Sequence, residues 1–130
     1  MKILVGYDGS RCAKAALDVA IFHAKSFKAS ILLVYSIIER IELDFVDADE
    51  AGTELEFQKK RVLDEGIECE AHLLIRDLMP GEDIVRFGQE NNVAEIIVGV
   101  KKRSRLEKIF FGSTARYVIL NAHCPVVTVK

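Results

Sequence analysis

The sequence predicts an open α/β fold of three layers, in which helices cover both faces of a parallel β-sheet. Short apolar segments of strand length alternate with longer segments whose apolar residues recur every three or four positions. The strand segments are nearly continuous in apolar residues, which is typical of parallel strands that are buried on both faces. The length of 130 residues fits a single domain that spans residues 1–130.

The first half of the chain contains two predicted strands and one predicted helix. Residues 2–7 are an apolar run that ends in turn residues, and residues 29–38 are a second such run. Between them, small and apolar residues recur at helical spacing from Ala13 to Ala24, and Ser10 is placed to cap the first turn. Residues 39–52 are acidic and weakly patterned, which predicts a loop or a helical approach to the next element.

The second half repeats the alternation. We expect helices over 54–65, over 80–90 and from 112 to about 122, and strands over 67–76, 94–98 and 126–129. Pro80 suits the first position of a helix, and Gly66 and Gly99 end the elements before them. The inner face of the last helix is predicted to consist of Ala115, Val118, Ile119 and Ala122.

The charge is uneven along the chain, although the net charge is only −2. Residues 39–56 carry eight acids and one base, whereas residues 101–108 carry five bases and one acid. A single basic block in an acidic protein indicates a local anion site or a solvated loop, and it makes a nucleic-acid surface unlikely, since that would need a broad basic face.

Membrane insertion and export are not expected. The longest stretch without Asp, Glu, Lys or Arg, 117–129, is too short and too polar to cross a bilayer, and no apolar core of a signal peptide follows Met1. The cytoplasm is therefore the expected compartment. Cys12, Cys69 and Cys124 are widely spaced and odd in number, so we expect reduced, structural thiols.

Candidate chemistry gathers where the predicted strands end. In open parallel sheets, ligands bind beyond the carboxyl ends of the strands, which here brings together Asp8, residues 35–37 and Gly99. Gly112-Ser113-Thr114 begins the last helix, where unpaired N–H groups and the helix dipole favour an anion. A simple cap by Ser113 is the alternative. Gly99, the basic segment after it and this helix start together indicate a phosphate site.

The chain resembles the universal stress protein family over nearly its full length. The family's opening strand that ends in Asp-Gly-Ser is similar to residues 3–10, and its Pro and Ile at the third helix are similar to Pro80 and Ile84. The family's ATP signature is Gly, two residues, Gly, nine residues, Gly, and Ser or Thr. Gly99, Gly112 and Ser113 match it, whereas Lys102 stands at the second glycine.

This resemblance implies an adenine nucleotide alpha hydrolase-like fold with strand order 3-2-1-4-5 and a site for ATP. Asp8 would lie near the ribose and adenine, the backbone of Ser36 would contact adenine, and the phosphates would lie between Gly99 and Gly112. The candidate binding residues are Tyr7, Asp8, Gly9, Ser36, Gly99, Val100, Lys101, Lys102, Arg103, Gly112, Ser113 and Thr114. It also implies a homodimer formed through the last strands, because residues 126–129 would otherwise be an exposed apolar edge.

Lys102 leaves two functions open. A lysine in place of a glycine either closes the site or, with its basic neighbours, neutralises a polyphosphate through side chains. The first function is an ATP-binding module in the stress response, and the alternative is an interaction protein that binds no nucleotide. Asp8 is either a ligand for Mg²⁺ or Mn²⁺ on the phosphates or a turn residue. The chain lacks the common nucleotide-hydrolase and esterase motifs, and no histidine is placed beside a carboxylate in sequence, so at most slow ATP hydrolysis is expected.

Overall fold

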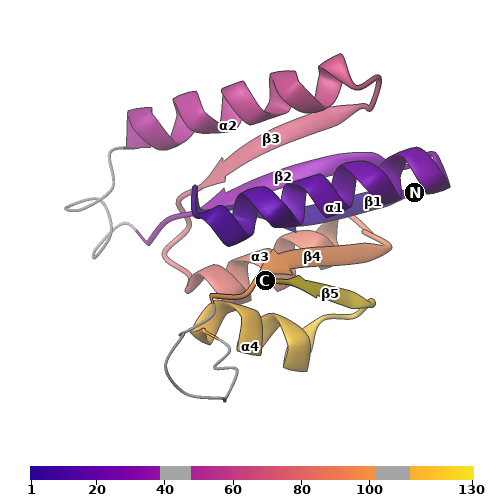
Figure 1. Cartoon of the computed structure of the whole chain (residues 1–130). Helices are drawn as coiled ribbons and strands as arrows, with labels where there is room; N and C mark the ends of the chain where they lie inside the picture. Colours follow the sequence, from indigo (N-terminus) through magenta and orange to yellow (C-terminus); the bar gives the residue numbers. More distant parts are fainter. Residues whose placement is uncertain (39–47, 102–111) are drawn as a thin grey trace.

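The computed structural model describes residues 1–38, 48–101 and 112–130, which form strands and helices in strict alternation after the first strand (Figure 1). The elements are β1 (Lys2–Gly6), α1 (Arg11–Phe27), β2 (Ser30–Ser36), α2 (Ala48–Asp64), β3 (Cys69–Leu74), α3 (Pro80–Glu90), β4 (Glu95–Gly99), α4 (Ser113–Asn121) and β5 (Val126–Val129). The α/β class predicted from the apolar pattern is thus confirmed.

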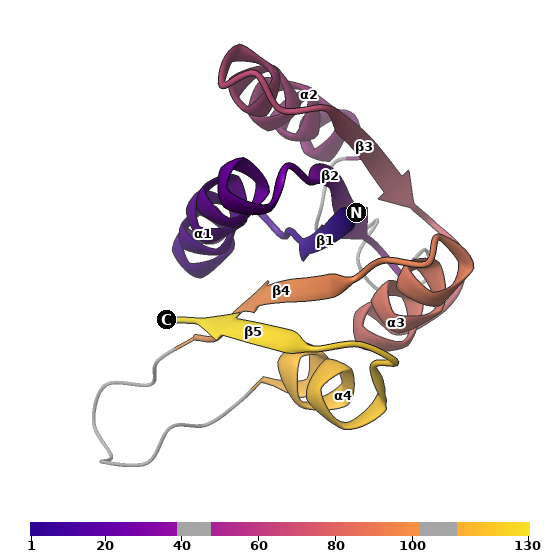
Figure 2. The same cartoon turned by 90° about the vertical axis from the view of Figure 1, so that its right-hand side faces the viewer.

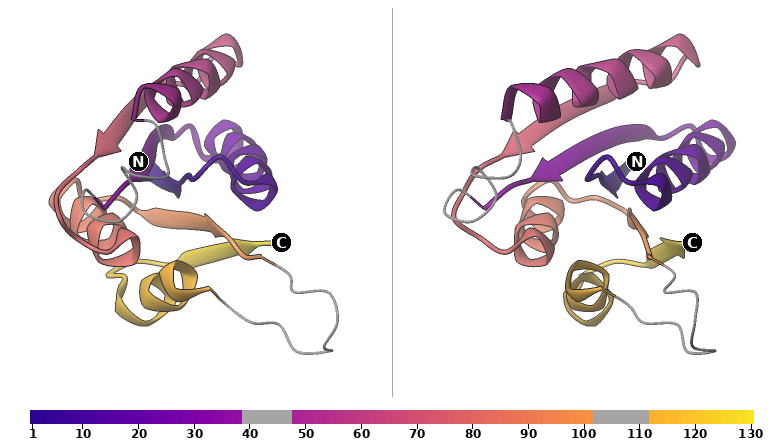
Figure 3. Two further views of the ribbon diagram at one scale, coloured as in Figure 1. Left: turned by 90° about the vertical axis from the view of Figure 1, so that its left-hand side faces the viewer. Right: turned by 60° about the vertical axis from the view of Figure 1, so that its left-hand side comes forward.

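All strand pairs are parallel, and the order across the sheet is β3-β2-β1-β4-β5. This is the order that the resemblance implies. β1 lies in the middle, with Leu4 opposite Leu32 of β2 on one side and opposite Ile96 of β4 on the other. β3 and β5 are the two edges, and β5 runs beside α4 (Figure 3).

Two apolar cores lie on opposite faces of the sheet, because successive strand residues point to opposite sides. Ile3, Val5 and Ile97 pack with α1 and α2, whereas Leu4 and Ile96 pack with α3 and α4. Figure 2 shows the two pairs of helices on the two faces. The sheet is therefore the central layer of three, as the continuous apolar strands predict.

The helix ends follow the expected local rules. The Ser10 hydroxyl accepts a hydrogen bond from the Ala13 N–H at 3.2 Å and caps α1. Lys28 ends that helix in a left-handed conformation, with φ of 54°. Pro80 occupies the first turn of α3.

Two local predictions need correction. α2 begins at Ala48, six residues before the helix predicted from Glu54, because buried Ala51 extends its inner face and the acids of its first turn favour the helix dipole. Ile119 was predicted to face inward but is 41% exposed, because Ala115 and Val118 form the buried line of α4. The rest of the acidic segment, residues 39–47, lies outside the described residues.

No helix in the described ranges is long and apolar enough to cross a membrane.

Candidate functional site

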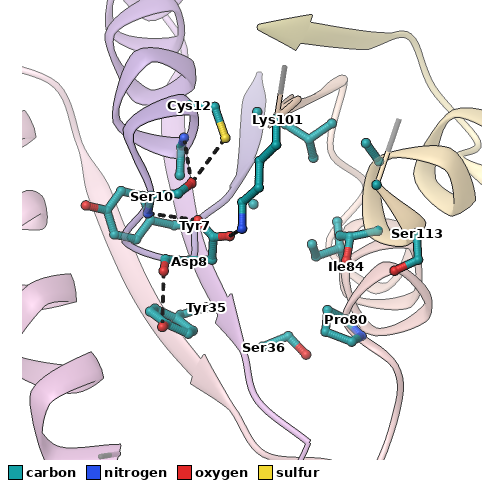
Figure 4. Close-up of a pocket in the computed structure, with 17 residues that line it drawn as sticks. Tyr7, Asp8, Ser10, Cys12, Tyr35, Ser36, Pro80, Ile84, Lys101 and Ser113 are labelled. Carbon is teal, nitrogen blue, oxygen red and sulfur yellow. Dashed lines mark hydrogen bonds and ion pairs between the residues drawn. The ribbon is translucent and has the colours of Figure 1, made fainter. Parts of the chain in front are cut away.

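A cavity of about 440 Å³ opens beyond the carboxyl ends of β1, β2 and β4, and α4 begins at its far wall (Figure 4). Of the candidate residues, the cavity is lined by Tyr7, Asp8, Ser36, Gly99, Lys101, Gly112, Ser113 and Thr114. This is the edge of the sheet where the strand order reverses, between β1's two neighbours. The topology thus brings together residues from positions 7 to 114.

Four candidate residues are not placed on the cavity wall. Gly9 has a φ of +81° and makes the turn from β1 into α1, a conformation that glycine adopts without strain. Val100 is buried in the core, and its N–H donates to the Val129 carbonyl at 2.7 Å. Lys102 and Arg103 lie outside the described residues.

Sequence reasoning missed part of the wall. Tyr35 lines the cavity as expected from its place at a strand end, and the additional lining residues are Gly6, Ser10, Cys12, Ala13, Pro80, Ile84, Val98 and Ala115. Pro80 and Ile84 carried a signal, since they belong to the family resemblance, but nothing in the sequence placed α3 against the end of β1. Gly6 permits this contact, because a Cβ at that position would meet Ile84 Cδ1 at 2.9 Å.

Asp8 is held in the turn through one carboxylate oxygen. Its Oδ1 accepts a hydrogen bond from the Ser10 N–H at 2.9 Å, which stabilises the turn between β1 and α1. Its Oδ2 lies 3.7 Å from Lys101 Nζ, and both side chains are largely exposed. The Tyr35 hydroxyl donates to the Asp8 carbonyl at 3.2 Å. One carboxylate oxygen therefore fixes the turn, and the other faces the open side of the site.

Tyr7 connects the cavity to α2. Its hydroxyl donates to Glu54 Oε1 at 2.6 Å, and Gln58 Nε2 donates to the same oxygen at 3.0 Å. Burial, together with the neighbouring Glu54 carboxylate, raises the pKa of Tyr7 well above its ordinary value, because both disfavour a phenolate. The two hydrogen bonds from Tyr7 and Gln58 lower the pKa of Glu54. The pair is thus held as a neutral phenol and a carboxylate.

Gly99 is required by packing rather than by backbone conformation. A Cβ there would lie 2.5 Å from the Cys12 carbonyl carbon and 2.8 Å from the Ala13 nitrogen, and both are main-chain atoms of α1. Main-chain atoms of a helix cannot move aside as the end of a side chain can. Gly99 therefore lets the first turn of α1 sit directly against the end of β4.

Gly112 differs from Gly99, because it faces open space. No atom lies within 4 Å of a Cβ built there, and its φ of −61° is accessible to any residue. Gly112 is the N-cap of α4 and provides no side-chain cap. The N–H of Arg116 makes the first turn's hydrogen bond, to the Gly112 carbonyl at 3.0 Å. The N–H groups before it have no acceptor within a helix, and such groups at a helix start bind anions.

The three histidines make structural contacts. The contact of His23 with a carboxylate could not be predicted from the sequence, because the two residues are far apart along the chain. His23 Nδ1 lies 2.6 Å from Glu95 Oε1, a pair that joins α1 to the start of β4 across 72 positions. The ring centres of His72 and Phe87 lie 4.9 Å apart. A ring nitrogen of His123 lies 3.1 Å from the Val93 carbonyl oxygen. None of the three lines the cavity.

The three thiols are free. Burial raises the pKa of Cys69 to about 11, and it also raises the pKa of Cys124. Cys12 lies at the first turn of α1, with its sulfur 3.1 Å from the Ser10 hydroxyl. Among the described residues, no group of three or more His, Cys, Asp or Glu side chains is placed to hold a metal ion.

The fold and the position of the cavity define an open α/β protein of strand order 3-2-1-4-5, and its similarity to solved universal stress proteins assigns it to the adenine nucleotide alpha hydrolase-like class. The universal stress protein family model matches residues 1–130, and the chain belongs to that family. Universal stress protein MJ0531 of Methanocaldococcus jannaschii is 30% identical, over 99% of this chain and 81% of its own length.

Solved structures agree with this membership. A universal stress protein from Archaeoglobus fulgidus is 36% identical with a TM-score of 0.88, and the match covers 100% of this chain and 98% of that one. A universal stress protein from the same organism, solved in complex with dAMP, is 32% identical with a TM-score of 0.82 over 100% of this chain and 98% of that one.

We predict that Gly99→Ala destabilises the fold by about 2–3 kcal/mol, since its methyl group is forced against the α1 main chain. Gly112→Ala is the matched control and should change stability by less than about 1 kcal/mol, because a poorer N-cap is offset by a less flexible unfolded chain. Urea unfolding measures both. Equal losses in the two variants would contradict the packing role of Gly99.

A second prediction concerns Tyr7. Because its pKa is raised in the folded protein, the contribution of the neutral phenol to stability is complete below pH 10 and is lost as the pH rises through the folded value. Absorbance titration at alkaline pH should show a tyrosine ionisation well above pH 10 that is absent in Tyr7→Phe. In Glu54→Gln this ionisation should move to lower pH, since the neighbouring negative charge is gone. An unchanged titration in Glu54→Gln would contradict the coupling.

Proposed function

We propose that this protein is an adenine-nucleotide-binding module of the stress response, with ATP as the expected ligand. The observation that carries the proposal is the dAMP complex of the A. fulgidus universal stress protein, which is 32% identical over the whole of this chain. The cavity at the strand ends supports it, because it joins polar groups at β1 and β2 to the open start of α4.

In this proposal the phosphates lie at the start of α4. The N–H groups of the first turn and the hydroxyls of Ser113 and Thr114 would donate to phosphate oxygens. The lack of a Cβ at Gly112 leaves room for close approach. Lys101, whose ammonium group lies at the cavity, would supply positive charge, and Lys102 and Arg103 would add to it in place of the missing motif glycine.

The base and ribose would then lie toward β1 and β2. Asp8 would accept hydrogen bonds from ribose hydroxyls through Oδ2, the oxygen that faces Lys101. Figure 4 shows Asp8 and Ser36 on the strand side of the cavity, opposite Ser113. A divalent cation would be held mainly by the phosphates, because Asp8 is the single carboxylate that lines the described wall.

Binding without rapid turnover fits these residues best. Fast hydrolysis needs a positioned water and stabilised transition-state charge, and the wall described here supplies Lys101 and helix N–H groups for the second requirement. An interaction protein that binds no nucleotide is the alternative. Lys102, which stands at the position of the second motif glycine, is the residue that favours this alternative.

The test is to identify what the purified protein releases on denaturation, and to titrate the emptied protein with ATP, ADP, AMP and dAMP by calorimetry, with and without Mg²⁺. We expect an adenine nucleotide to bind and to be recovered largely unchanged. Gly112→Ala should weaken ATP binding by roughly tenfold, since its methyl group enters the phosphate site.

Gly52→Ala is the matched control, because a Cβ there also meets no atom within 4 Å but lies on α2, away from the cavity. Its affinity should equal that of the parent protein. An empty protein that ignores all four nucleotides would reject nucleotide binding and favour the interaction protein, whereas rapid conversion of ATP would show an enzyme.

We also propose a homodimer formed by pairing of the β5 edges. Ile96 donates its N–H to the Pro125 carbonyl at 3.0 Å, and Val100 donates to the Val129 carbonyl at 2.7 Å. The main-chain N–H and C=O groups of residues 125, 127 and 129 therefore point toward β4. Those of Val126 and Thr128 point to the open edge of the sheet. An unpaired edge of this kind is a template for a second copy.

Thr128→Pro tests the dimer, since proline removes an N–H that points away from β4 and keeps the ladder within the chain. We expect the parent to have twice the 14.6 kDa chain mass by light scattering and Thr128→Pro to be monomeric with an unchanged circular dichroism spectrum. Thr128→Ala retains the N–H and should remain dimeric. A Thr128→Pro dimer would exclude this edge as the interface.

A further inference from the structure

A fully buried carboxylate lies directly behind the cavity wall. Asp83 of α3 has no exposed surface, and its Oδ2 accepts a hydrogen bond from the Ser36 hydroxyl at 2.7 Å. Its Oδ1 accepts from Arg76 Nε at 2.6 Å, with the Nη2 of the same guanidinium at 2.5 Å. One carboxylate thus joins the end of β2, the segment after β3 and the first turn of α3.

Arg76 is itself held on several sides. Its Nη1 lies 3.4 Å from Glu90 Oε2 near the end of α3, and its Nη2 also donates to the Asp83 carbonyl at 3.4 Å. The guanidinium lies 5.7 Å from the centre of the Phe87 ring. The position of the Asp83 carboxylate, and through it that of Ser36, is therefore fixed by contacts along the length of α3.

Stability alone does not explain this network. Moving an ion pair out of water costs much of the free energy that the attraction between its charges returns. Apolar groups of similar volume therefore often stabilise a fold equally well. A network in which both carboxylate oxygens accept hydrogen bonds does fix the positions of the groups that it joins. The part of it that reaches the candidate site is Ser36, whose hydroxyl points back to Asp83 while the residue lines the cavity.

The main-chain groups of Ser36 face the cavity. Ile37 donates its N–H to the Leu74 carbonyl of β3 at 2.9 Å, so the N–H and C=O of Ser36, one position earlier, point to the opposite side, toward β1. The β1–β2 ladder ends at the pair Gly6 and Val34, two residues before Ser36. Beyond that point the cavity takes the place of a neighbouring strand.

A single extended residue presents an acceptor and a donor side by side, and the 6-amino group and N1 of adenine present the complementary donor and acceptor. We propose that Asp83, braced by Arg76, is a positioning residue that holds the Ser36 peptide for this pairing and thereby makes the site selective for 6-aminopurines. This inference rests on the proposed nucleotide-binding function. In hypoxanthine an oxygen replaces the amino group, so it would face the Ser36 carbonyl with no hydrogen to share.

The test compares the dissociation constants of ATP and ITP for the full chain, since the two share ribose and triphosphate. We expect the parent to prefer ATP by about tenfold, as a site with a buried polar partner rejects an analogue that cannot pair. Ser36→Ala should reduce ATP affinity by roughly three- to tenfold, leave ITP affinity unchanged and so bring the ratio toward one. Ser26→Ala is the matched control, because its hydroxyl donates to the Phe22 carbonyl on an exposed turn of α1, away from the cavity.

Asp83→Asn is the second variant, and it should also lower the ATP-to-ITP ratio, since Arg76 loses the nearer of its two carboxylate partners. If Asp83→Asn does not fold by circular dichroism, Ser36→Ala supplies the answer, because it retains the Asp83–Arg76 pair. An unchanged ratio in a folded Ser36→Ala, or a uniform loss of both affinities, overturns the inference while the nucleotide site stands. A parent that binds neither nucleotide rejects the proposed function and this inference together, and a parent that binds both equally rejects the inference alone.

Discussion

The structure depends on one constraint, which is that β1 pairs in parallel with β2 on one side and with β4 on the other. Right-handed crossovers on the two sides of β1 then cover opposite faces of the sheet, so that α1 and α2 pack on one core and α3 and α4 on the other. The connections that follow β1 and β4 lead to opposite faces of the sheet, and the cavity lies between the ends of these two strands. The candidate site therefore follows from strand order, and the side chains around it give that space its chemistry.

The two described glycines of the family signature have different structural roles. Gly99 brings the first turn of α1 against the end of β4, whereas Gly112 faces open space at the start of α4. One is a packing constraint of the fold, and the other leaves room at a helix start that attracts anions. The signature is thus a set of separate local requirements. The lysine at position 102 changes one of them and leaves the packing at Gly99 and the open helix start at Gly112 in place.

The sequence was sufficient for those features that depend on local patterns. Apolar runs located all five strands in the described chain, Ser10 and Pro80 marked helix starts, and eight candidate residues line one cavity. The start of α2 was misplaced because its first turns carry charge and few apolar residues. The pairs Tyr7–Glu54, Ser36–Asp83 and His23–Glu95 could not be foreseen, since each joins residues 47 to 72 positions apart and leaves no periodic signal.

These long-range contacts are not spread evenly around the cavity. On the strand side, Tyr7 is tied to α2 and Ser36 to α3, and both are buried residues with fixed partners. On the opposite side, Ser113 and Lys101 are exposed, and the helix start of α4 has no side-chain cap. A rigid, buried wall discriminates by hydrogen-bond pattern, whereas exposed charges and helix N–H groups accept any anion of suitable size. In the proposed nucleotide site, selection of the base would therefore fall to the strand side, and the α4 side would tolerate a sequence change such as Lys102 in the residues that neutralise phosphate charge.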